Sequence, residues 1–176
     1  KTGMRLQGKH IAYLVEDQFE DLEFWVPVMR LREEGAEVSV VGTGRMETYH
    51  GKHGLNATPD TTAEKVDADD FDAVVIPGGW APDKLRRFAA VKKLVRETYR
   101  QGKILGSICH GGWVLASAGI LDGHRATGST GIKDDMENAG ATWVDKPAFR
   151  DGNIVWGRVV QDIPDFCREL VNAIAG

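Results

Sequence analysis

The sequence has few cysteines and no long apolar run. Only Cys109 and Cys167 occur among the 176 residues, and a bridge between two such distant thiols is not favoured. No apolar stretch approaches the roughly 18–20 residues that cross a bilayer. Residues 1–10 also lack the apolar core of an export signal. We therefore expect a reduced, cytoplasmic protein with no membrane partner.

A surplus of positive charge and the common cofactor motifs are also lacking. The 22 Lys and Arg residues face 26 Asp and Glu residues, which gives a net charge of −4 and argues against a nucleic-acid partner. The stretch GTGRME (42–47) lacks the third glycine of a dinucleotide fingerprint, and there is no phosphate loop of the G-x-x-x-x-G-K-[ST] form. His50 and His53 have no companion ligands at suitable spacing for a metal. We expect neither a cofactor nor a metal.

Short apolar runs alternate with longer segments of helical periodicity along the chain. The apolar runs predict strands at 10–15, 36–42, 71–79, 103–109, 141–145 and 153–160. The periodic segments predict helices at 21–35, 89–102, 110–121, 132–140 and 163–176. The stretch 43–70 is irregular, and within it 46–60 is predicted as a hairpin or an irregular loop. Because parallel strands need right-handed crossovers, this alternation predicts an α/β fold. We expect one flavodoxin-like domain over 1–176, a doubly wound, mostly parallel sheet with helices on both faces.

The segment SICHG (107–111) places a thiol where a strand meets a helix. It has the spacing of the nucleophile elbow G-x-S-x-G, with Cys109 as the nucleophile and the small residues Ser107 and Gly111 on either side. Such a turn presents the side chain outward, and the start of the following helix favours a thiolate, so we expect a lowered thiol pKa. The alternative is a small buried apolar side chain, which is what we expect of Cys167.

Polar groups after two other strands reach the same edge of the sheet. After the first strand, VEDQFEDLEF supplies five carboxyl groups, those of Glu16, Asp17, Glu20, Asp21 and Glu23. Most are expected to cap the helix start, whereas a buried one would keep its proton and share a hydrogen bond with the thiolate. After the third strand, Gly78 and Gly79 either complete an oxyanion hole with the His110 N–H and the backbone of Gly111 or simply end the strand. The His110 side chain is either an acid–base group or a surface residue.

Five segments in order carry a resemblance to a known family: FEDLE, GKHG, VIPGGWAP, SICHG and GIKDDMENAGATWVD. Together they closely resemble the PfpI-type intracellular protease family, which belongs to the superfamily of the parkinsonism-associated deglycase. The resemblance covers residues 9–174. It implies a flavodoxin-like fold of the class I glutamine amidotransferase type.

The resemblance implies roles for four side chains. Cys109 corresponds to the nucleophile and His110 to the histidine that follows it. Glu20, in the FED motif, corresponds to the glutamate that hydrogen-bonds the reactive sulfur. The third acid of the family's triad comes from a neighbouring subunit, and Asp83 holds that position here. The site would then exist only in a homodimer or a larger homo-oligomer.

The chain departs from the family pattern at two places. It reads CHGGW where members commonly read CHGPQ, so Trp113 is expected to narrow the pocket. The late SRTPDDLP reads GRVVQDIP, which keeps Arg158 and Pro164 but loses the proline after the arginine. These changes bear on substrate preference more than on the nucleophile.

The resemblance implies an enzyme whose Cys109 attacks a carbonyl carbon. Relatives are described as peptidases, as glyoxalases and as deglycases, and small dicarbonyl or glycated substrates fit a narrow pocket better than a long peptide. The alternative is a redox-sensing stress protein without turnover, because a reactive thiolate is easily oxidised and a protonated Glu20 would stabilise the sulfinate. A holdase chaperone would need exposed apolar surface that the sequence does not show.

Overall fold

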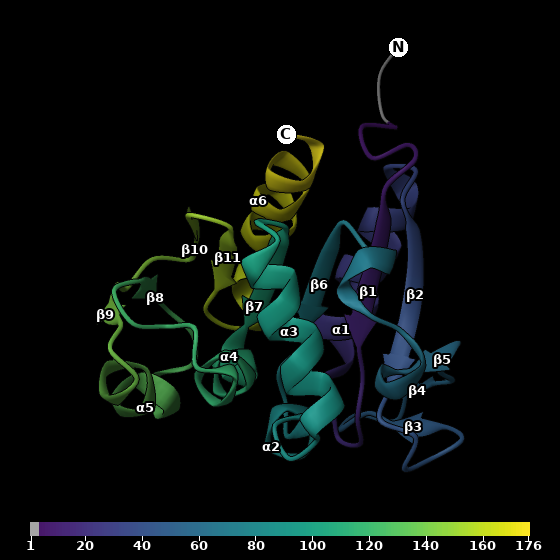
Figure 1. Cartoon of the computed structure of the whole chain (residues 1–176), viewed down its shortest axis with the longest axis horizontal. Helices are drawn as coiled ribbons and strands as arrows, with labels where there is room; N and C mark the ends of the chain where they lie inside the picture. Colours follow the sequence, from purple (N-terminus) through teal and green to yellow (C-terminus); the bar gives the residue numbers. More distant parts are fainter. Residues whose placement is uncertain (1–3) are drawn as a thin grey trace.

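Seven strands form the central sheet of the computed structural model, which describes residues 4–176 (Figure 1). Their order across the sheet is β10-β11-β7-β6-β1-β2-β5, and only the β10–β11 pair is antiparallel. The strands are β1 (His10–Leu14), β2 (Glu37–Gly42), β5 (Thr61–Thr62), β6 (Ala73–Ile76), β7 (Ile104–Ile108), β10 (Ala148–Asp151) and β11 (Ile154–Gly157). Read in the opposite direction, the five parallel strands β2, β1, β6, β7 and β11 have the flavodoxin-like order 2-1-3-4-5. The predicted α/β fold is confirmed.

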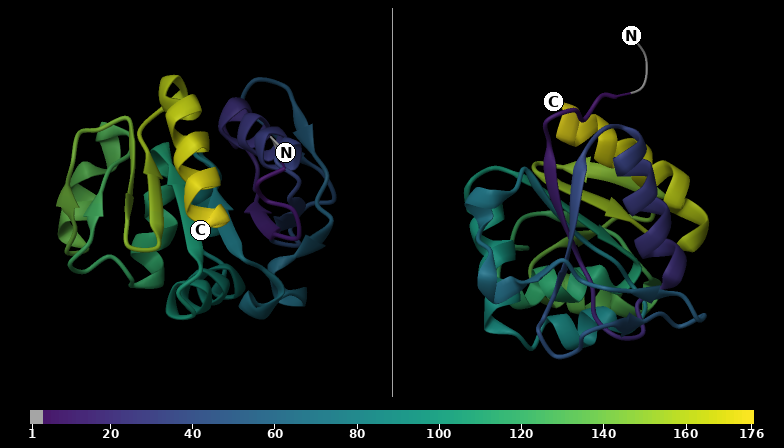
Figure 2. Two further views of the ribbon diagram at one scale, coloured as in Figure 1. Left: turned by 90° about the horizontal axis from the view of Figure 1, so that it is seen from above. Right: turned by 90° about the vertical axis from the view of Figure 1, so that its right-hand side faces the viewer.

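Helices cover both faces of this sheet (Figure 2). On one face, α1 (Asp21–Glu33) packs against α6 (Ile163–Ala175). On the other face, α3 (Ala89–Arg100) packs against α4 (Gly112–Ala118). The short helices α2 (Ala81–Leu85) and α5 (Lys133–Asn138) both contact α4.

The central strands are mostly apolar because both of their faces are covered. Every residue of β6 and of β7 is buried. Gly106 in β7 allows α6 to come close, since a Cβ atom there would lie 2.7 Å from Leu170 Cδ2. The next residue, Ser107, points to the opposite face, toward the start of α4. This alternation places the end of β7 between two helical layers.

The differences from the predicted elements concern short segments. The hairpin alternative for 46–60 is confirmed by β3 (Tyr49–His50) and β4 (Asn56–Ala57), whereas β5 at the edge of the sheet was not predicted. The late strand predicted at 141–145 is β9 (Thr142–Trp143), which pairs with β8 (Arg125–Ala126) outside the main sheet. A two-residue strand is only as long as one apolar–polar repeat, so its sequence cannot show the alternation that identifies a strand.

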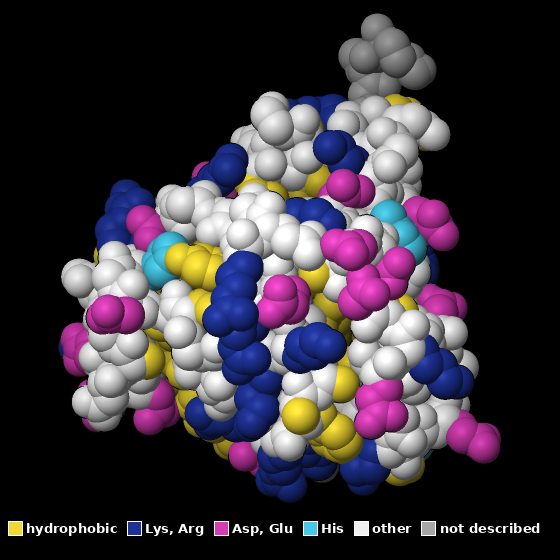
Figure 3. Space-filling view, viewed as in Figure 1, with side chains coloured by type: hydrophobic (Ala, Val, Ile, Leu, Met, Phe, Trp, Pro, Cys, Tyr) yellow, Lys and Arg dark blue, Asp and Glu magenta, His cyan; other side chains and the backbone are white. Residues whose placement is uncertain are grey.

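The negative net charge conceals an uneven surface. Between positions 84 and 103 the chain has eight cationic side chains and one acidic side chain, Glu97. The cations are Lys84, Arg86, Arg87, Lys92, Lys93, Arg96, Arg100 and Lys103. Figure 3 shows dark-blue side chains gathered along α3. Across residues 4–176, no helix combines the length and the apolarity that a membrane crossing requires.

Candidate active site

Cys109 lies at a strained turn between β7 and α4. Its φ angle is +61°, which is rare for a residue other than glycine. A single 3-10 turn, Cys109–Gly111, connects the strand to the helix. Gly111 is needed there, because a Cβ atom would lie 2.7 Å from Ser107 Oγ and 3.1 Å from the Ile76 carbonyl oxygen. The turn therefore has the geometry that the SICHG spacing predicts, and Gly111 serves close packing.

The carboxyl group beside the sulfur belongs to Glu23. A Cβ atom added at Gly78 would lie 2.2 Å from Glu23 Oε1 and 2.7 Å from Cys109 Cβ, so both side chains close on the same glycine. The thiol and the Gly78 N–H are the groups that interact with this carboxyl. These contacts are looser than full hydrogen bonds, since neither Glu23 oxygen completes one among residues 4–176. Glu23 itself is 1% exposed.

Glu20 has a different place, so the predicted contact between Glu20 and the sulfur is wrong. Glu20 is the N-cap of α1, and its Oε2 accepts the Leu22 N–H at 3.5 Å. Its Oε1 lies 3.8 Å from Lys52 Nζ and 3.4 Å from His53 Nε2. A capping residue turns its side chain toward the helix start. Glu23 follows one turn later and points into the site.

The ionisation of the thiol and of the carboxyl is coupled. Burial and the charge of Glu20 raise the pKa of Glu23 to about 8. Burial and the Glu23 carboxylate raise the pKa of the Cys109 thiol to about 12, although the His110 and Gly79 N–H groups lower it. The predicted lowering of the thiol pKa is therefore wrong. Burial and the negative charge of Glu23 raise the thiol pKa by more than the N-terminus of the short helix α4 lowers it. The carboxyl beside the sulfur is neutral only while Glu23 keeps its proton.

Two backbone N–H groups face the sulfur, those of Gly79 and His110. Gly79 has a φ angle of +71°, and a Cβ atom there would lie 2.4 Å from the Glu20 nitrogen, so only glycine fits. The Gly78 N–H is directed at Glu23 instead. Of the three glycines predicted to form an oxyanion hole, only Gly79 directs its N–H at the sulfur.

The His110 ring lies against the thiol and between two tryptophans. Its Nδ1 is 3.2 Å from Cys109 Sγ. The ring centroids of Trp80 and Trp113 lie 5.6 Å and 5.1 Å from that of His110. Burial and the positive charge of Lys52 lower the pKa of His110, so the ring is neutral at pH 7 and able to accept a proton.

A cavity of about 260 Å³ opens on these groups. Its lining residues come from five separate segments of the chain: Glu20, Glu23, Lys52, Gly79, Trp80, Cys109, His110, Val159, Val160 and Gln161. Trp113 is not among them. Its ring packs behind His110 and its Nε1 donates to Asp135 at 2.8 Å, so the prediction that it narrows the pocket is wrong. The residues after Arg158, where the family's proline is lost, form one wall instead.

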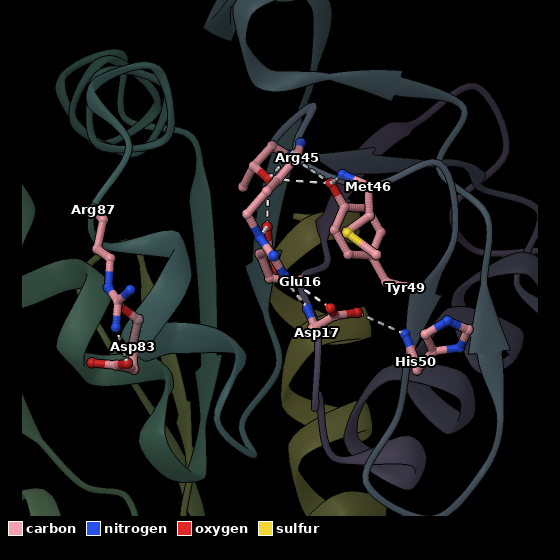
Figure 4. Close-up of polar contacts among 9 residues, drawn as sticks. Glu16, Asp17, Arg45, Met46, Tyr49, His50, Asp83 and Arg87 are labelled. Atoms are coloured by element: carbon pink, nitrogen blue, oxygen red, sulfur yellow. Dashed lines mark hydrogen bonds and ion pairs between the residues drawn. The ribbon is translucent and has the colours of Figure 1, made fainter.

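Asp83 does not line the cavity of its own chain. It lies on α2 and pairs with Arg87 Nη2 at 2.6 Å, with its side chain 45% exposed (Figure 4). A role in the site of a neighbouring subunit therefore stays a prediction. In the same view, Arg87 points toward Asp83.

A buried ion pair holds the loop between β1 and α1. Glu16 is fully buried, and its carboxylate accepts Arg45 Nη2 at 2.9 Å and Nε at 3.2 Å. Arg45 also reaches Asp17, whose other oxygen accepts the His50 N–H at 3.0 Å (Figure 4). Gln18 follows in a left-handed conformation, and its carbonyl accepts the Trp80 N–H at 2.8 Å. The network thus supports the turn that carries Gly79.

The other residues singled out in the sequence lie apart from the thiol. Cys167 is 5% exposed in α6, as predicted. His50 Nδ1 pairs with Asn56 Oδ1 at 2.7 Å, and His53 faces Glu20. In the described part of the chain, no group of three or more His, Cys, Asp or Glu side chains could hold a metal.

Sequence reasoning missed Lys52, Trp80 and the wall from Val159 to Gln161. Lys52 lies in the GKHG segment and Trp80 in VIPGGWAP, so both stand inside motifs that were recognised but not assigned. Glu23 was counted among the carboxyls of the loop, with the expectation that a buried one would have a raised pKa. Helical spacing contained the signal, because Glu20 and Glu23 are three residues apart and only one of them can cap the helix.

The chain is similar to known proteins over nearly its whole length. A profile of the DJ-1/PfpI family matches residues 9–173. A protein named deglycase PH1704, from Pyrococcus horikoshii, is 43% identical over 164 residues, which cover 93% of this chain and 98% of that protein. General stress protein 18 of Bacillus subtilis is 40% identical, with 92% and 95% covered.

A solved structure extends the likeness to three dimensions. A two-domain protein from Anabaena variabilis contains DJ-1/ThiJ/PfpI-like and ferritin-like domains. It matches with a TM-score of 0.91 and 41% identity over 93% of this chain and 49% of that one. On the family profile and the identity to these relatives, this chain belongs to the DJ-1/PfpI family.

Proposed function

We propose that this protein is a cysteine-dependent enzyme of the PfpI type that attacks the carbonyl carbon of small dicarbonyl compounds or glycated substrates. The observation that carries the proposal is the Cys109 thiol, held at a strained turn beside a buried carboxyl and two backbone N–H groups. Relatives at about 40% identity are named deglycases, which supports the same reaction class.

The proposed reaction begins with transfer of the thiol proton to His110, whose Nδ1 lies 3.2 Å from the sulfur. The sulfur then forms a bond to the carbonyl carbon, and the C=O electron pair moves onto the oxygen. The Gly79 and His110 N–H groups stabilise that negative charge, and the protonated Glu23 supplies a proton to give a hemithioacetal. For a 2-oxoaldehyde, a hydrogen then shifts from C1 to C2, and water releases the 2-hydroxy acid. No external oxidant is needed.

The size of the cavity favours small substrates. A volume of about 260 Å³, closed on one side by Val159 and Val160, accommodates a few carbon atoms beside the sulfur. A peptidase needs a longer groove on both sides of the attacked bond. We therefore favour glyoxalase or deglycase activity over peptidase activity.

The proposal includes a homo-oligomer. Asp83 lies outside the cavity of its own chain. It contributes to a catalytic site only if assembly places it beside His110 of a neighbouring copy. In that arrangement Asp83 orients the imidazole, and the complete site lies near the interface.

The test compares turnover of methylglyoxal and of a fluorogenic peptide by the wild type, Cys109→Ala and Cys167→Ala. We expect the wild type and Cys167→Ala to convert methylglyoxal at similar rates and Cys109→Ala to be inactive. Turnover that survives in Cys109→Ala would refute the proposal. Conversion of the peptide but not of methylglyoxal would assign the peptidase reaction instead.

A second function, redox sensing, is favoured by the position of Glu23. A carboxyl that keeps its proton up to about pH 8 can donate a hydrogen bond to a sulfinate formed on Cys109. After mild peroxide treatment, intact mass should show the addition of two oxygens at Cys109 in the wild type. Selective oxidation together with no turnover in the assays above would favour the sensor. The absence of such oxidation while substrate is converted would exclude it.

A further inference from the structure

Lys52 lines the cavity from a loop that a buried carboxylate holds against α1. The loop between β3 and β4 carries Lys52, and the Lys52 N–H donates to the Phe19 carbonyl at 3.0 Å. Asp21, at the start of α1, accepts the N–H groups of His53 at 2.9 Å and of Leu55 at 2.8 Å. Asp21 is 2% exposed, so these bonds are shielded from water. The backbone under Lys52 is therefore fixed relative to the helix that carries Glu23.

The accessible charge of the cavity is positive. Among the described residues that line it, only Lys52 carries a full positive charge at pH 7, since the His110 ring is neutral. The Lys52 side chain is 36% exposed, whereas that of its neighbour Glu20 is 10% exposed. Glu23 is almost entirely buried. Of the charged side chains that line the cavity, that of Lys52 is thus the most accessible to a ligand.

Glu20 does not use up the hydrogen-bonding capacity of Lys52. The distance of 3.8 Å from Lys52 Nζ to Glu20 Oε1 is too long for a hydrogen bond. Glu20 is also shared with the Leu22 N–H and with His53. No side chain among residues 4–176 hydrogen-bonds Nζ of Lys52, although an ammonium group has three N–H donors. Those donors are available to a ligand.

We infer that Lys52 determines specificity in this site by binding the carboxylate of a small carbonyl substrate, next to the carbon that Cys109 attacks. A single ammonium group matches the single charge of a carboxylate, and a cavity of about 260 Å³ suits a small molecule. The substrate class is therefore 2-oxo acids, aldehydic acids and their adducts with amines. This inference rests on the proposed function, because it assigns the substrate of the same thiol.

The test uses two alkylating reagents that differ in charge. Iodoacetate and iodoacetamide have similar size and the same leaving group, and each forms an S–C bond to Cys109 as iodide departs. Both report the same thiolate fraction, so a change in thiol pKa cancels in the ratio of their rates. The rates at Cys109 are measured by peptide mass spectrometry in the wild type, Lys52→Met, Lys52→Arg and Lys93→Met. Lys93 is an exposed lysine of α3 and controls for net charge.

We expect the ratio of the iodoacetate rate to the iodoacetamide rate to fall about fivefold in Lys52→Met. The ratio should stay near the wild-type value in Lys52→Arg and in Lys93→Met. An unchanged ratio in Lys52→Met would overturn the inference, as would an equal fall in Lys93→Met. The exposed position of Lys52 on a loop makes misfolding of the variants improbable, and a thermal melt checks this.

A second measurement addresses the substrate class. Glyoxylate adds reversibly to a thiol to give a hemithioacetal, and it should protect Cys109 from iodoacetamide. Lys52→Met should weaken protection by glyoxylate and leave protection by the uncharged methylglyoxal unchanged; equal loss for both would overturn the inference. Neither experiment requires turnover. If the wild type converts no carbonyl substrate but the ratio of the iodoacetate and iodoacetamide rates depends on Lys52, the proposed function is refuted while carboxylate binding by Lys52 stands.

Discussion

Cys109 lies at the turn after β7 and Glu23 in the first turn of α1, yet both close on Gly78, where a Cβ atom would lie 2.7 Å from Cys109 Cβ and 2.2 Å from Glu23 Oε1. The packing of α1 against the Gly78–Gly79 turn thus places the carboxyl group beside the thiol. Three of the predictions below follow from this contact.

Replacing Glu23 should change the reactivity of Cys109 in a pH-dependent way. Once the Glu23 carboxyl ionises near pH 8, its charge opposes formation of the thiolate. Glu23→Gln removes this charge, so we expect iodoacetamide to react about tenfold faster at pH 9 in the variant than in the wild type. At pH 6 the two rates should be similar, because Glu23 is then protonated. A rate difference that does not depend on pH would contradict this coupling.

Glu23 should also make folding stability depend on pH. Its pKa in the folded chain, about 8, is above the reference value of 4.5, so the folded state holds the proton more tightly than the unfolded state. The stabilisation that this bound proton gives to the folded state is therefore complete below pH 4.5 and is lost as the pH rises toward 8. Between pH 6 and pH 8, we expect urea unfolding to show a gain of roughly 2 kcal/mol for Glu23→Gln relative to the wild type. Parallel pH profiles would rule this out.

Adding one methyl group at Gly78 should disrupt the site. In Gly78→Ala the new Cβ atom would displace the Glu23 carboxyl and the Cys109 side chain. We expect Cys109-dependent turnover of methylglyoxal to fall by at least about tenfold. Gly131→Ala is the matched control, because its nearest neighbour would be His110 Nε2 at an ordinary 3.8 Å. Equal activity of the two variants would show that the contact at Gly78 does not matter.

The two arginine–carboxylate pairs in Figure 4 should differ in their effect on stability. Arg45→Met leaves the fully buried Glu16 without its main partner, which should lower the free energy of unfolding by about 3–5 kcal/mol. Arg87→Met breaks a largely exposed pair with Asp83 and should cost less than about 1 kcal/mol. Urea denaturation of both variants gives the comparison. Similar losses in the two would contradict the assignment of Glu16 as a buried charge.

The predicted contribution of Asp83 to a neighbouring subunit can be tested by mixing two inactive variants. If Asp83 acts across an interface, a mixed oligomer of Cys109→Ala and Asp83→Ala chains contains some sites with both groups intact. We expect such mixtures, refolded together, to recover part of the methylglyoxal turnover that each variant lacks alone. No recovery in oligomers shown to be mixed would place Asp83 outside the reaction.

The main elements of the fold were predictable because their signals are local. The apolar run at 10–15 became β1 and that at 103–109 became β7, since a strand covered on both faces is apolar at most of its positions. The SICHG spacing likewise predicted the sharp turn at Cys109, because small residues on both sides are what such a turn needs. The short strands β8 and β10 were not predicted, because pairing partners rather than local periodicity define them.

Local patterns in the sequence predict the order of the main strands and helices, the sharp turn at Cys109 and the edge of the sheet where polar groups gather. Three features depend on the packed structure: the carboxyl that faces the sulfur, the position of Lys52 and the extent to which burial raises the thiol pKa. Glu20 and Glu23 are chemically alike and three residues apart, so composition and motif do not separate them. Burial and distance do, and both depend on how the β1–α1 loop, the Gly78–Gly79 turn and the β3–β4 hairpin pack together.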